Sequence, residues 1–366
     1  MKKKSYIMAI LATSVLTACS SSGNDNTLRT LTAETSQVYS ILEKTPSDGF
    51  LFGHQDATVY GIGWENKEGE SDVKRVCGDY PAVVGFDLGE LEVGNLSNLD
   101  KVSFDKMKQE IINQYSRGGV VTLSWHARNP LTGGDAWDVK DTTVVKSILP
   151  GGKNHQKFIT GLDKVADFIN SLVTAEGVKV PVIFRPWHEH TGSWFWWGKD
   201  LCSVDDYKQL WRMTYDRFIE KGVDNVLYAY SPGGGCSSEE YMERYPGDDF
   251  VDLLGFDYYQ LGTDVEAYRE VMNKTLTYLT KLGREHGKPI AVTETGYEAV
   301  PDSIWWTQTL LPIIEKYPVS YVLVWRNARE KVNHYYAPYP GQVSADDFMK
   351  FYANERTLFL NDINKK

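Results

Sequence analysis

Two glutamates, each directly after a run of apolar residues, are the side chains best suited to chemistry. Glu189 lies in VIFRPWHEHTGSWFWWG and Glu294 lies in IAVTETGY. A carboxylic acid and a carboxylate on either side of a sugar can break a glycosidic bond, and a separation of ~5–5.5 Å gives net retention. The alternative is that each is an ordinary carboxylate paired with Arg185 or Arg326. Two glutamates at such positions favour the catalytic interpretation.

Aromatic residues crowd the sequence around Glu189, and aromatic faces bind flat ligands of low charge. They are Trp187, Trp194, Phe195, Trp196 and Trp197. Adjacent aromatics often divide between core and site, so we expect one of the last two to be core. The stretch predicts a sugar cleft.

The elements that must position these residues alternate between strand and helix. Short apolar runs begin at residues 50, 81, 119, 181, 225, 251, 289 and 319, and such runs are typical of strands buried on both faces. Helical spacing occurs in 104–115, 158–173, 207–218, 267–282 and 304–314. The pattern predicts an α/β fold, a (β/α)8 TIM barrel, in a single domain over residues 32–366. An open doubly wound sheet would need a glycine-rich phosphate turn after its first strand, and Gly53-His54-Gln55 does not supply one.

A barrel brings the carboxyl ends of its strands to one mouth. Polar or aromatic residues occupy these ends: Gly53-His54, Asp87, His126, Glu189, Tyr230-Ser231, Asp257-Tyr258, Glu294 and Trp325-Arg326. Residues that merely meet solvent would include Lys, Ser and Asn at random. We therefore expect a site at this mouth.

The sequence around both glutamates resembles one family of enzymes. Arg185-Pro186-Trp187-His188-Glu189, continued by an aromatic run that ends at Gly198, resembles the acid/base motif of glycoside hydrolase family 26, the β-mannanase family among the retaining (β/α)8 glycosidases. Thr293-Glu294-x-Gly296 resembles the nucleophile strand of that family. The resemblance extends through 124–130, 255–259 and 324–327, and so covers essentially the mature chain.

The resemblance implies a role for individual residues. Glu189 would be the general acid/base and Glu294 the nucleophile. Substrate would be bound by His126, Trp137, His188, Trp194, Tyr258 and Trp325, with His188 and Tyr258 bonded to the nucleophile or the cleaved sugar. No cofactor is implied. His188 and His190 flank Glu189 without the H-E-x-x-H spacing of a zinc site, so we expect no metal.

The resemblance also implies a substrate, β-1,4-linked mannan, galactomannan or manno-oligosaccharides. Mixed-linkage β-glucan and xylan stay open, because relatives cut these as well, and a non-catalytic glycan-binding protein is a third alternative. The connections from Gly89 to Asp100 and from His126 to about His155 are longer than usual for a barrel. If they wall one end of the cleft, we expect exo action that releases mannobiose; if they leave it open, we expect an endo-acting mannanase.

The N-terminus predicts export. Three lysines precede an apolar run that is too short to span a bilayer and ends in Leu16-Thr17-Ala18-Cys19. This resembles the lipobox of bacterial lipoproteins, with a signal peptide over 1–18, lipidation at Cys19 and a tether over 19–31. Because no acidic residue directly follows Cys19, we expect the periplasmic side, with the outer cell surface as the alternative.

Charge and cysteine content limit partners and cross-links. The net charge of −10 disfavours nucleic acid, membrane contact other than through the lipid is not expected, and we expect a monomer. Without Cys19 the chain has Cys77, Cys202 and Cys236. Cys202 and Cys236 follow neighbouring strands, so we expect them to form a disulfide.

Overall fold

The structure is a computed structural model that describes residues 29–364. The predicted signal peptide, Cys19 and most of the predicted tether lie outside these residues. Within the described range, no helix is both long enough and apolar enough to cross a membrane.

Eight parallel strands form a closed ring, which confirms the predicted TIM barrel. Their order around the ring is the order along the chain, and pairing of the last strand with the first closes it. The barrel strands are β1 (Phe50–Gln55), β4 (Val83–Asp87), β5 (Val120–Ser124), β6 (Val182–Arg185), β7 (Val226–Tyr230), β8 (Leu253–Gln260), β9 (Ile290–Tyr297) and β10 (Val319–Val324). Each falls in one of the eight apolar runs of the sequence. Two short strands, β2 (Tyr60–Gly61) and β3 (Trp64–Glu65), pair with each other, and β11 (Thr357–Leu358) pairs with β1.

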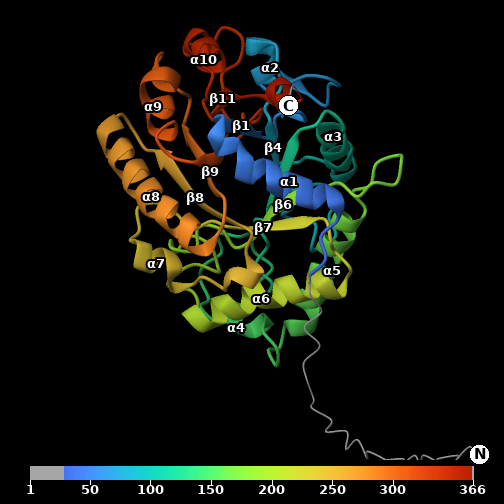
Figure 1. The fold of residues 1–366 in the computed structure, drawn as a ribbon. Coiled ribbons are helices and arrows are strands. Elements are labelled where there is room, and N and C mark those ends of the chain that lie inside the picture. The colour runs from blue at the N-terminus through green and yellow to red at the C-terminus, as the bar shows by residue number, and fades with distance from the viewer. Residues whose placement is uncertain (1–28, 365–366) are drawn as a thin grey trace, which may run out of the picture. The chain divides into compact units, whose positions relative to one another are not determined.

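Helices surround the strands (Figure 1). They are α1 (Ala33–Lys44), α2 (Asp72–Cys77), α3 (Phe104–Ser116), α4 (Val144–Ile148), α5 (His155–Asn170), α6 (Val204–Glu220), α7 (Ser238–Glu243), α8 (Val265–His286), α9 (Leu311–Ile314), α10 (Ala345–Tyr352) and α11 (Leu360–Ile363). Four of the five predicted helices appear as α3, α5, α6 and α8. The fifth, predicted over 304–314, is instead a π-helical turn over Trp306–Leu310 followed by α9. Pro312 lacks the N–H that a continuous α-helix needs there.

Helix α6 illustrates how sequence sets these elements. The Ser203 side chain accepts a hydrogen bond from the Asp206 amide, which caps the helix start. Its buried residues recur at helical spacing and form one face: Tyr207, Leu210, Trp211, Thr214 and Phe218. This face packs toward the strands.

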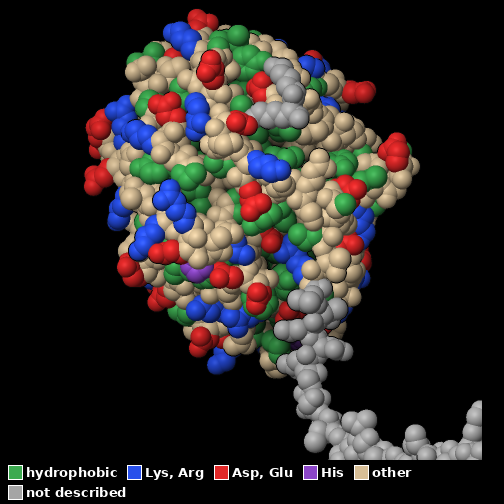
Figure 2. Space-filling view, in the orientation of Figure 1, with side chains coloured by type: hydrophobic (Ala, Val, Ile, Leu, Met, Phe, Trp, Pro, Cys, Tyr) green, Lys and Arg blue, Asp and Glu red, His purple; other side chains and the backbone are tan. Residues whose placement is uncertain are grey.

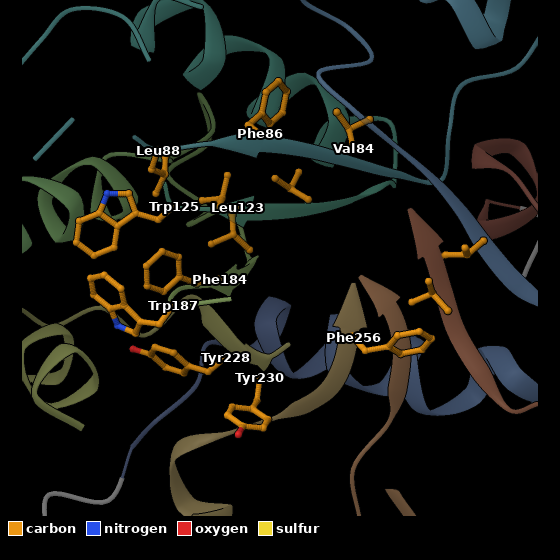
Figure 3. Close-up of a cluster of buried hydrophobic side chains, with 14 of the residues drawn as sticks. Val84, Phe86, Leu88, Leu123, Trp125, Phe184, Trp187, Tyr228, Tyr230 and Phe256 are labelled. Carbon is orange, nitrogen blue, oxygen red and sulfur yellow. The ribbon is translucent and has the colours of Figure 1, made fainter. Parts of the chain in front are cut away.

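Each barrel strand is buried on both faces, which explains the continuous apolar runs. Val83, Ile183 and Leu227 belong to a cluster inside the barrel, and Val38 and Leu42 of α1 belong to the same cluster. Helix α1 lies across one end of the barrel and covers the side chains inside it (Figure 1). The alternate residues, including Val84, Phe184 and Tyr228, join a second cluster between strands and helices (Figure 3). On the molecular face in Figure 2, acidic and basic side chains are interspersed.

Candidate active site

Glu294 lies within β9 and is held by an arginine and a tyrosine. Arg185 at the end of β6 forms an ion pair with Glu294 Oε1, and the Tyr259 hydroxyl donates to Oε2 at 2.7 Å. A register shift between β8 and β9 pairs Phe256 with Val292 but Asp257 with Glu294. This bulge brings Glu294 beside Asp257, and bulges commonly re-aim side chains at the rims of barrels.

The arginine is shared between two carboxylates. Arg185 Nη1 lies 2.7 Å from Asp257 Oδ2, and the Thr293 hydroxyl donates to Asp257 Oδ1 at 2.7 Å. Ser231 Oγ lies 2.8 Å from Thr293 Oγ1. A buried arginine needs acidic partners, and this network fixes the guanidinium at the carboxylate that it must orient.

Glu189 occupies a different kind of position, a turn after β6 rather than a strand. The φ angles of Trp187 and Glu189 are both 53°, in the left-handed region. The Trp194 indole N–H donates to Glu189 Oε2 at 2.6 Å. Burial and the neighbouring Glu294 charge raise the pKa of Glu189 to about 7, against the opposing effect of the Trp194 hydrogen bond. A carboxyl with this pKa carries a proton near neutral pH and can donate it.

Packed aromatic rings support the turn from behind. The ring centroid of Trp187 lies 4.9 Å from that of Trp125 and 5.4 Å from those of Trp196 and Trp197. Trp187, Trp125 and Phe184 are neighbours in the buried cluster of Figure 3. Trp196 and Trp197 are both fully buried, so both are core rather than one of the two.

A cavity of about 840 Å³ brings most of the predicted site residues together. Its lining includes Glu189, Glu294, His126, Trp137, Trp194, Trp325 and Tyr259. Trp137 and Trp194 are each 47% exposed, whereas most tryptophans of the barrel are buried. Among residues 29–364, no three His, Cys, Asp or Glu side chains gather in a way that could hold a metal ion.

Tyr258 is not the tyrosine that contacts Glu294, so the predicted bond to the nucleophile is wrong, and its bond to the cleaved sugar stays a prediction. Its ring is nearly parallel to that of Tyr268 on α8, with centroids 6.0 Å apart, and Tyr259 donates to Glu294 instead. Side chains alternate along a strand, so Tyr259 shares the inner face with Asp257 while Tyr258 faces the helix. The prediction rested on the position of Tyr258 at the strand end and not on this alternation.

His188 does not contact the nucleophile, the first of its two predicted partners, and its bond to the cleaved sugar stays a prediction. It is buried, and its Nε2 lies 3.2 Å from Nε2 of His126, which lines the cavity. Asp87 Oδ2 lies 2.7 Å from His126 Nδ1. Burial lowers the pKa of His126, but the Asp87 carboxylate outweighs burial and raises it. His188 therefore supports His126 rather than Glu294.

Four polar residues of this site are not among the predicted site residues: Asp87, Arg185, Asp257 and Tyr259. Asp87 and Asp257 were identified as strand ends without a partner, and Arg185 was considered only as a neutralising partner of a glutamate. The available signal was the arginine in VIFR, because an arginine in an otherwise apolar buried strand requires carboxylates nearby. Two-residue alternation from Asp257 would have found Tyr259.

The predicted disulfide between Cys202 and Cys236 is wrong, since both thiols are free. Cys202 Sγ lies 3.3 Å from Arg244 Nη1, and Cys236 Sγ lies 3.5 Å from the Tyr278 hydroxyl oxygen. Each thiol packs against different neighbours, although the strands that precede them are adjacent.

Comparisons with known proteins agree with the resemblance seen in the sequence. The model of glycosyl hydrolase family 26 matches residues 29–305. A solved GH26 β-mannanase from Bacteroides ovatus is 62% identical, with 90% of this chain and 96% of that chain covered and a TM-score of 0.89. A modular endo-β-1,4-mannanase from Cellulomonas fimi is 34% identical, with 92% and 77% covered and a TM-score of 0.83. A mannan endo-1,4-β-mannosidase from Bifidobacterium adolescentis is 34% identical over 91% of this chain, which spans 35% of that relative.

Proposed function

The chain belongs to glycosyl hydrolase family 26, and from this premise we propose that it hydrolyses β-1,4-mannosidic bonds in mannan, galactomannan or manno-oligosaccharides. The observation that carries the proposal is the unequal pair of carboxyl groups in one cavity. Glu189 has a pKa of about 7, whereas Glu294 is ion-paired with Arg185 and hydrogen-bonded to Tyr259. Relatives of this chain are named as β-mannanases, which supports the choice of sugar.

In the first step, Glu294 attacks the anomeric carbon as Glu189 protonates the leaving oxygen. The carbon–oxygen bond to the leaving sugar breaks, and an ester bond to Glu294 forms. Arg185 and Tyr259 hold the carboxylate in one orientation before the attack. The attack then needs no reorganisation of the nucleophile.

In the second step, Glu189 must act as a base, and the first step prepares it. Part of the rise in the Glu189 pKa comes from the Glu294 charge, and ester formation removes that charge. The pKa of Glu189 therefore falls once the ester forms, so the carboxylate is ready to take a proton from water. Water then attacks the same carbon and gives a proton to Glu189, the ester bond to Glu294 breaks, and the two displacements give net retention.

Three tryptophans and a histidine are suited to bind the sugars. Trp137, Trp194 and Trp325 line the cavity and offer ring faces to flat sugar surfaces, while His126 offers a polar edge. Trp194 has two roles in this proposal, because its indole N–H also bonds Glu189.

The experiment that tests the function is a comparison of products on galactomannan, glucomannan, mixed-linkage β-glucan and xylan. We expect hydrolysis of the first two, with the β-anomer of the reducing end appearing first in NMR spectra. Initial appearance of the α-anomer would overturn the retaining mechanism. Hydrolysis of only glucan or xylan would overturn the mannan assignment, and binding without hydrolysis would favour the glycan-binding alternative.

For the mode of action we propose endo cleavage, in line with the names of the relatives. Exo release of mannobiose is a second candidate, favoured by a contact between two loops at the cavity rim. Arg326 Nη2 lies 2.9 Å from Asp100 Oδ1, and Arg329 Nη2 donates to the Lys101 carbonyl at 3.4 Å. These residues join the connection after β4 to the connection after β10.

Early products separate the two modes. Mannohexaose and soluble mannan should give a range of product sizes with a rapid fall in viscosity if the cleft is open at both ends. One dominant disaccharide with a slow fall in viscosity would favour exo action instead.

We also propose that the exported protein is anchored through a lipid on Cys19 and faces the periplasm. The lysine-rich start, the apolar run and Leu16-Thr17-Ala18-Cys19 support this placement. Cys19→Ala should release the protein from membranes. Digestion by protease added to intact cells would contradict the periplasmic placement and favour the outer cell surface.

A further inference from the structure

The turn that carries Glu189 has a backbone conformation that its residues rarely adopt alone. Both Trp187 and Glu189 have φ of 53°, and a bulky residue such as tryptophan is an outlier in this region. Such conformations persist only where the surrounding structure holds them. The contacts of this turn therefore determine where the Glu189 carboxyl lies.

Three different parts of the chain hold successive peptide groups of the turn. The Tyr207 hydroxyl from α6 donates to the Trp187 carbonyl at 2.9 Å. The Trp197 indole donates to the His188 carbonyl at 2.8 Å, and the Glu189 amide donates to the Ser231 carbonyl at 2.8 Å. Of these three contacts, the one from Tyr207 comes from a helix behind the barrel wall.

A buried histidine connects Tyr207 to a second tyrosine. His190 Nδ1 lies 2.8 Å from the Tyr207 hydroxyl oxygen, and His190 Nε2 lies 2.9 Å from the Tyr230 hydroxyl oxygen. All three side chains are fully buried. Tyr230 lies in the same buried cluster as Trp187 (Figure 3). None of the three lines the cavity that contains Glu189.

The histidine contacts the same carbonyl as Tyr207. Burial, reinforced by the Arg244 charge, lowers the pKa of His190 to about 3, so the ring is neutral. Its Nδ1 lies 3.2 Å from the Trp187 carbonyl oxygen as well as 2.8 Å from the Tyr207 hydroxyl oxygen. The Tyr230 hydroxyl, which donates to the Tyr241 carbonyl at 2.8 Å, contacts the ring at Nε2 and holds it in this position.

We propose that Tyr207 and His190 are positioning residues for Glu189 that together fix the Trp187 carbonyl, with Tyr230 holding the His190 ring in place. They touch neither the substrate nor the reacting atoms and act through the backbone of the turn. The inference rests on the proposed role of Glu189 as the general acid/base. It extends that role to residues on the far side of the barrel wall.

Substrates that differ in their need for an acid provide the test. The 2,4-dinitrophenolate leaving group departs without protonation, whereas a sugar leaving group requires it. Tyr207→Phe should lower kcat/KM on mannotetraose by about tenfold or more, because general acid catalysis contributes about 10²–10⁴-fold. Its kcat/KM on 2,4-dinitrophenyl β-mannobioside should stay within about twofold of the wild type, because that constant reports the step that forms the ester.

Tyr241→Phe is the matched control. Tyr241 is fully buried, and its hydroxyl donates to the Gly255 carbonyl at 2.9 Å and to the Tyr230 backbone carbonyl at 3.4 Å, not to the Trp187, His188 or Glu189 peptide groups. This variant removes one hydroxyl that bonds a backbone carbonyl, as Tyr207→Phe does. We expect it to leave the ratio of the two kcat/KM values unchanged.

Tyr230→Phe is the second test variant, since it removes the hydroxyl that contacts His190 Nε2 without changing a residue of the turn. We expect the same selective loss on mannotetraose, smaller than that of Tyr207→Phe. Equal losses on both substrates, or no loss in Tyr207→Phe, would overturn the proposal. Failure of both variants to fold, judged by circular dichroism, would leave only a structural role and would also overturn it.

Different experiments test the role of Glu189 and the positioning role of Tyr207, so the two can be contradicted separately. An inactive wild type, or a Glu189→Ala variant that azide does not rescue, would count against the assignment of Glu189. Normal results for both, together with a non-selective Tyr207→Phe, would count only against the positioning role.

Discussion

The surroundings of the two glutamates proposed as catalytic differ in nearly every physical respect. Glu294 lies in strand β9 beside a bulge and faces polar groups, with Arg185 and Tyr259 bonded to its oxygens. Glu189 lies on a left-handed turn in front of a layer of tryptophans, and its carboxyl has one side-chain donor, Trp194. These surroundings fit the proposed roles, in which the same kind of side chain is a nucleophile at Glu294 and an acid at Glu189.

The difference shows that position and protonation are controlled by separate parts of the barrel. The ionic network around Glu294 involves residues of β6, β8 and β9, which are fixed by the sheet. The environment of Glu189 depends on the loop after β6 and on the helix behind it. Variants of the two regions should therefore fail in different ways.

Glu294→Gln should have the largest effect. It removes the nucleophile but keeps the shape of the side chain, so we expect kcat to fall by at least about 10⁴-fold. Titration calorimetry with mannohexaose should show binding within about threefold of the wild type. Hydrolysis of mannan at the wild-type rate would show that another residue is the nucleophile.

Glu189→Ala should have the next largest effect, and a selective one. Loss of the general acid should lower kcat/KM on manno-oligosaccharides by about 10²–10⁴-fold. On 2,4-dinitrophenyl β-mannobioside the ester should still form, and azide should restore turnover and yield a mannosyl azide. Azide should not rescue Glu294→Gln, which is the internal control.

Tyr259→Phe tests the polar side of the comparison, with Tyr258→Phe as its matched control. A hydrogen bond to a charged group contributes about 1.5–3 kcal/mol, so loss of the Tyr259 hydroxyl should lower kcat/KM by roughly 10–100-fold. Tyr258→Phe should change kcat/KM by less than about twofold, because its ring faces α8. Equal effects of the two substitutions would contradict the assigned faces of β8.

Trp194→Phe tests the apolar side and should have the smallest effect on rate at acidic pH. Its indole N–H bonds the ionised carboxyl, so its removal should raise the pKa of Glu189 above the wild-type value of about 7. Activity requires the protonated acid and is lost as pH rises through that pKa. The basic limb of the kcat/KM profile should therefore move to higher pH, and a shift to lower pH would contradict the assignment.

The sequence was sufficient for the barrel and for the two glutamates, because both depend on local patterns. Eight apolar runs place eight strands, and the strand ends place Glu189 and Glu294. Contacts between residues that are distant in the sequence could not be predicted from it and were seen only in the structure. The register shift that sets Glu294 beside Asp257, the left-handed turn at Trp187 and the separate packing of Cys202 and Cys236 depend on neighbours distant in sequence. Tyr259 is the exception, because alternation from Asp257 was available in the sequence.

The closure of the barrel by its first and last strands has a consequence for synthesis of the chain. The Ser320 hydroxyl donates to the Leu42 carbonyl across 278 residues, and β1 pairs with β10 and β11. At about 5–20 residues per second, the ribosome needs on the order of 15–55 s to synthesise β10 after β1 has emerged. One edge of β1 waits unpaired for that time, although both catalytic glutamates are made before β10. An exposed strand edge can pair with another chain, so a translational stall before β10 should yield aggregation-prone molecules that carry both glutamates.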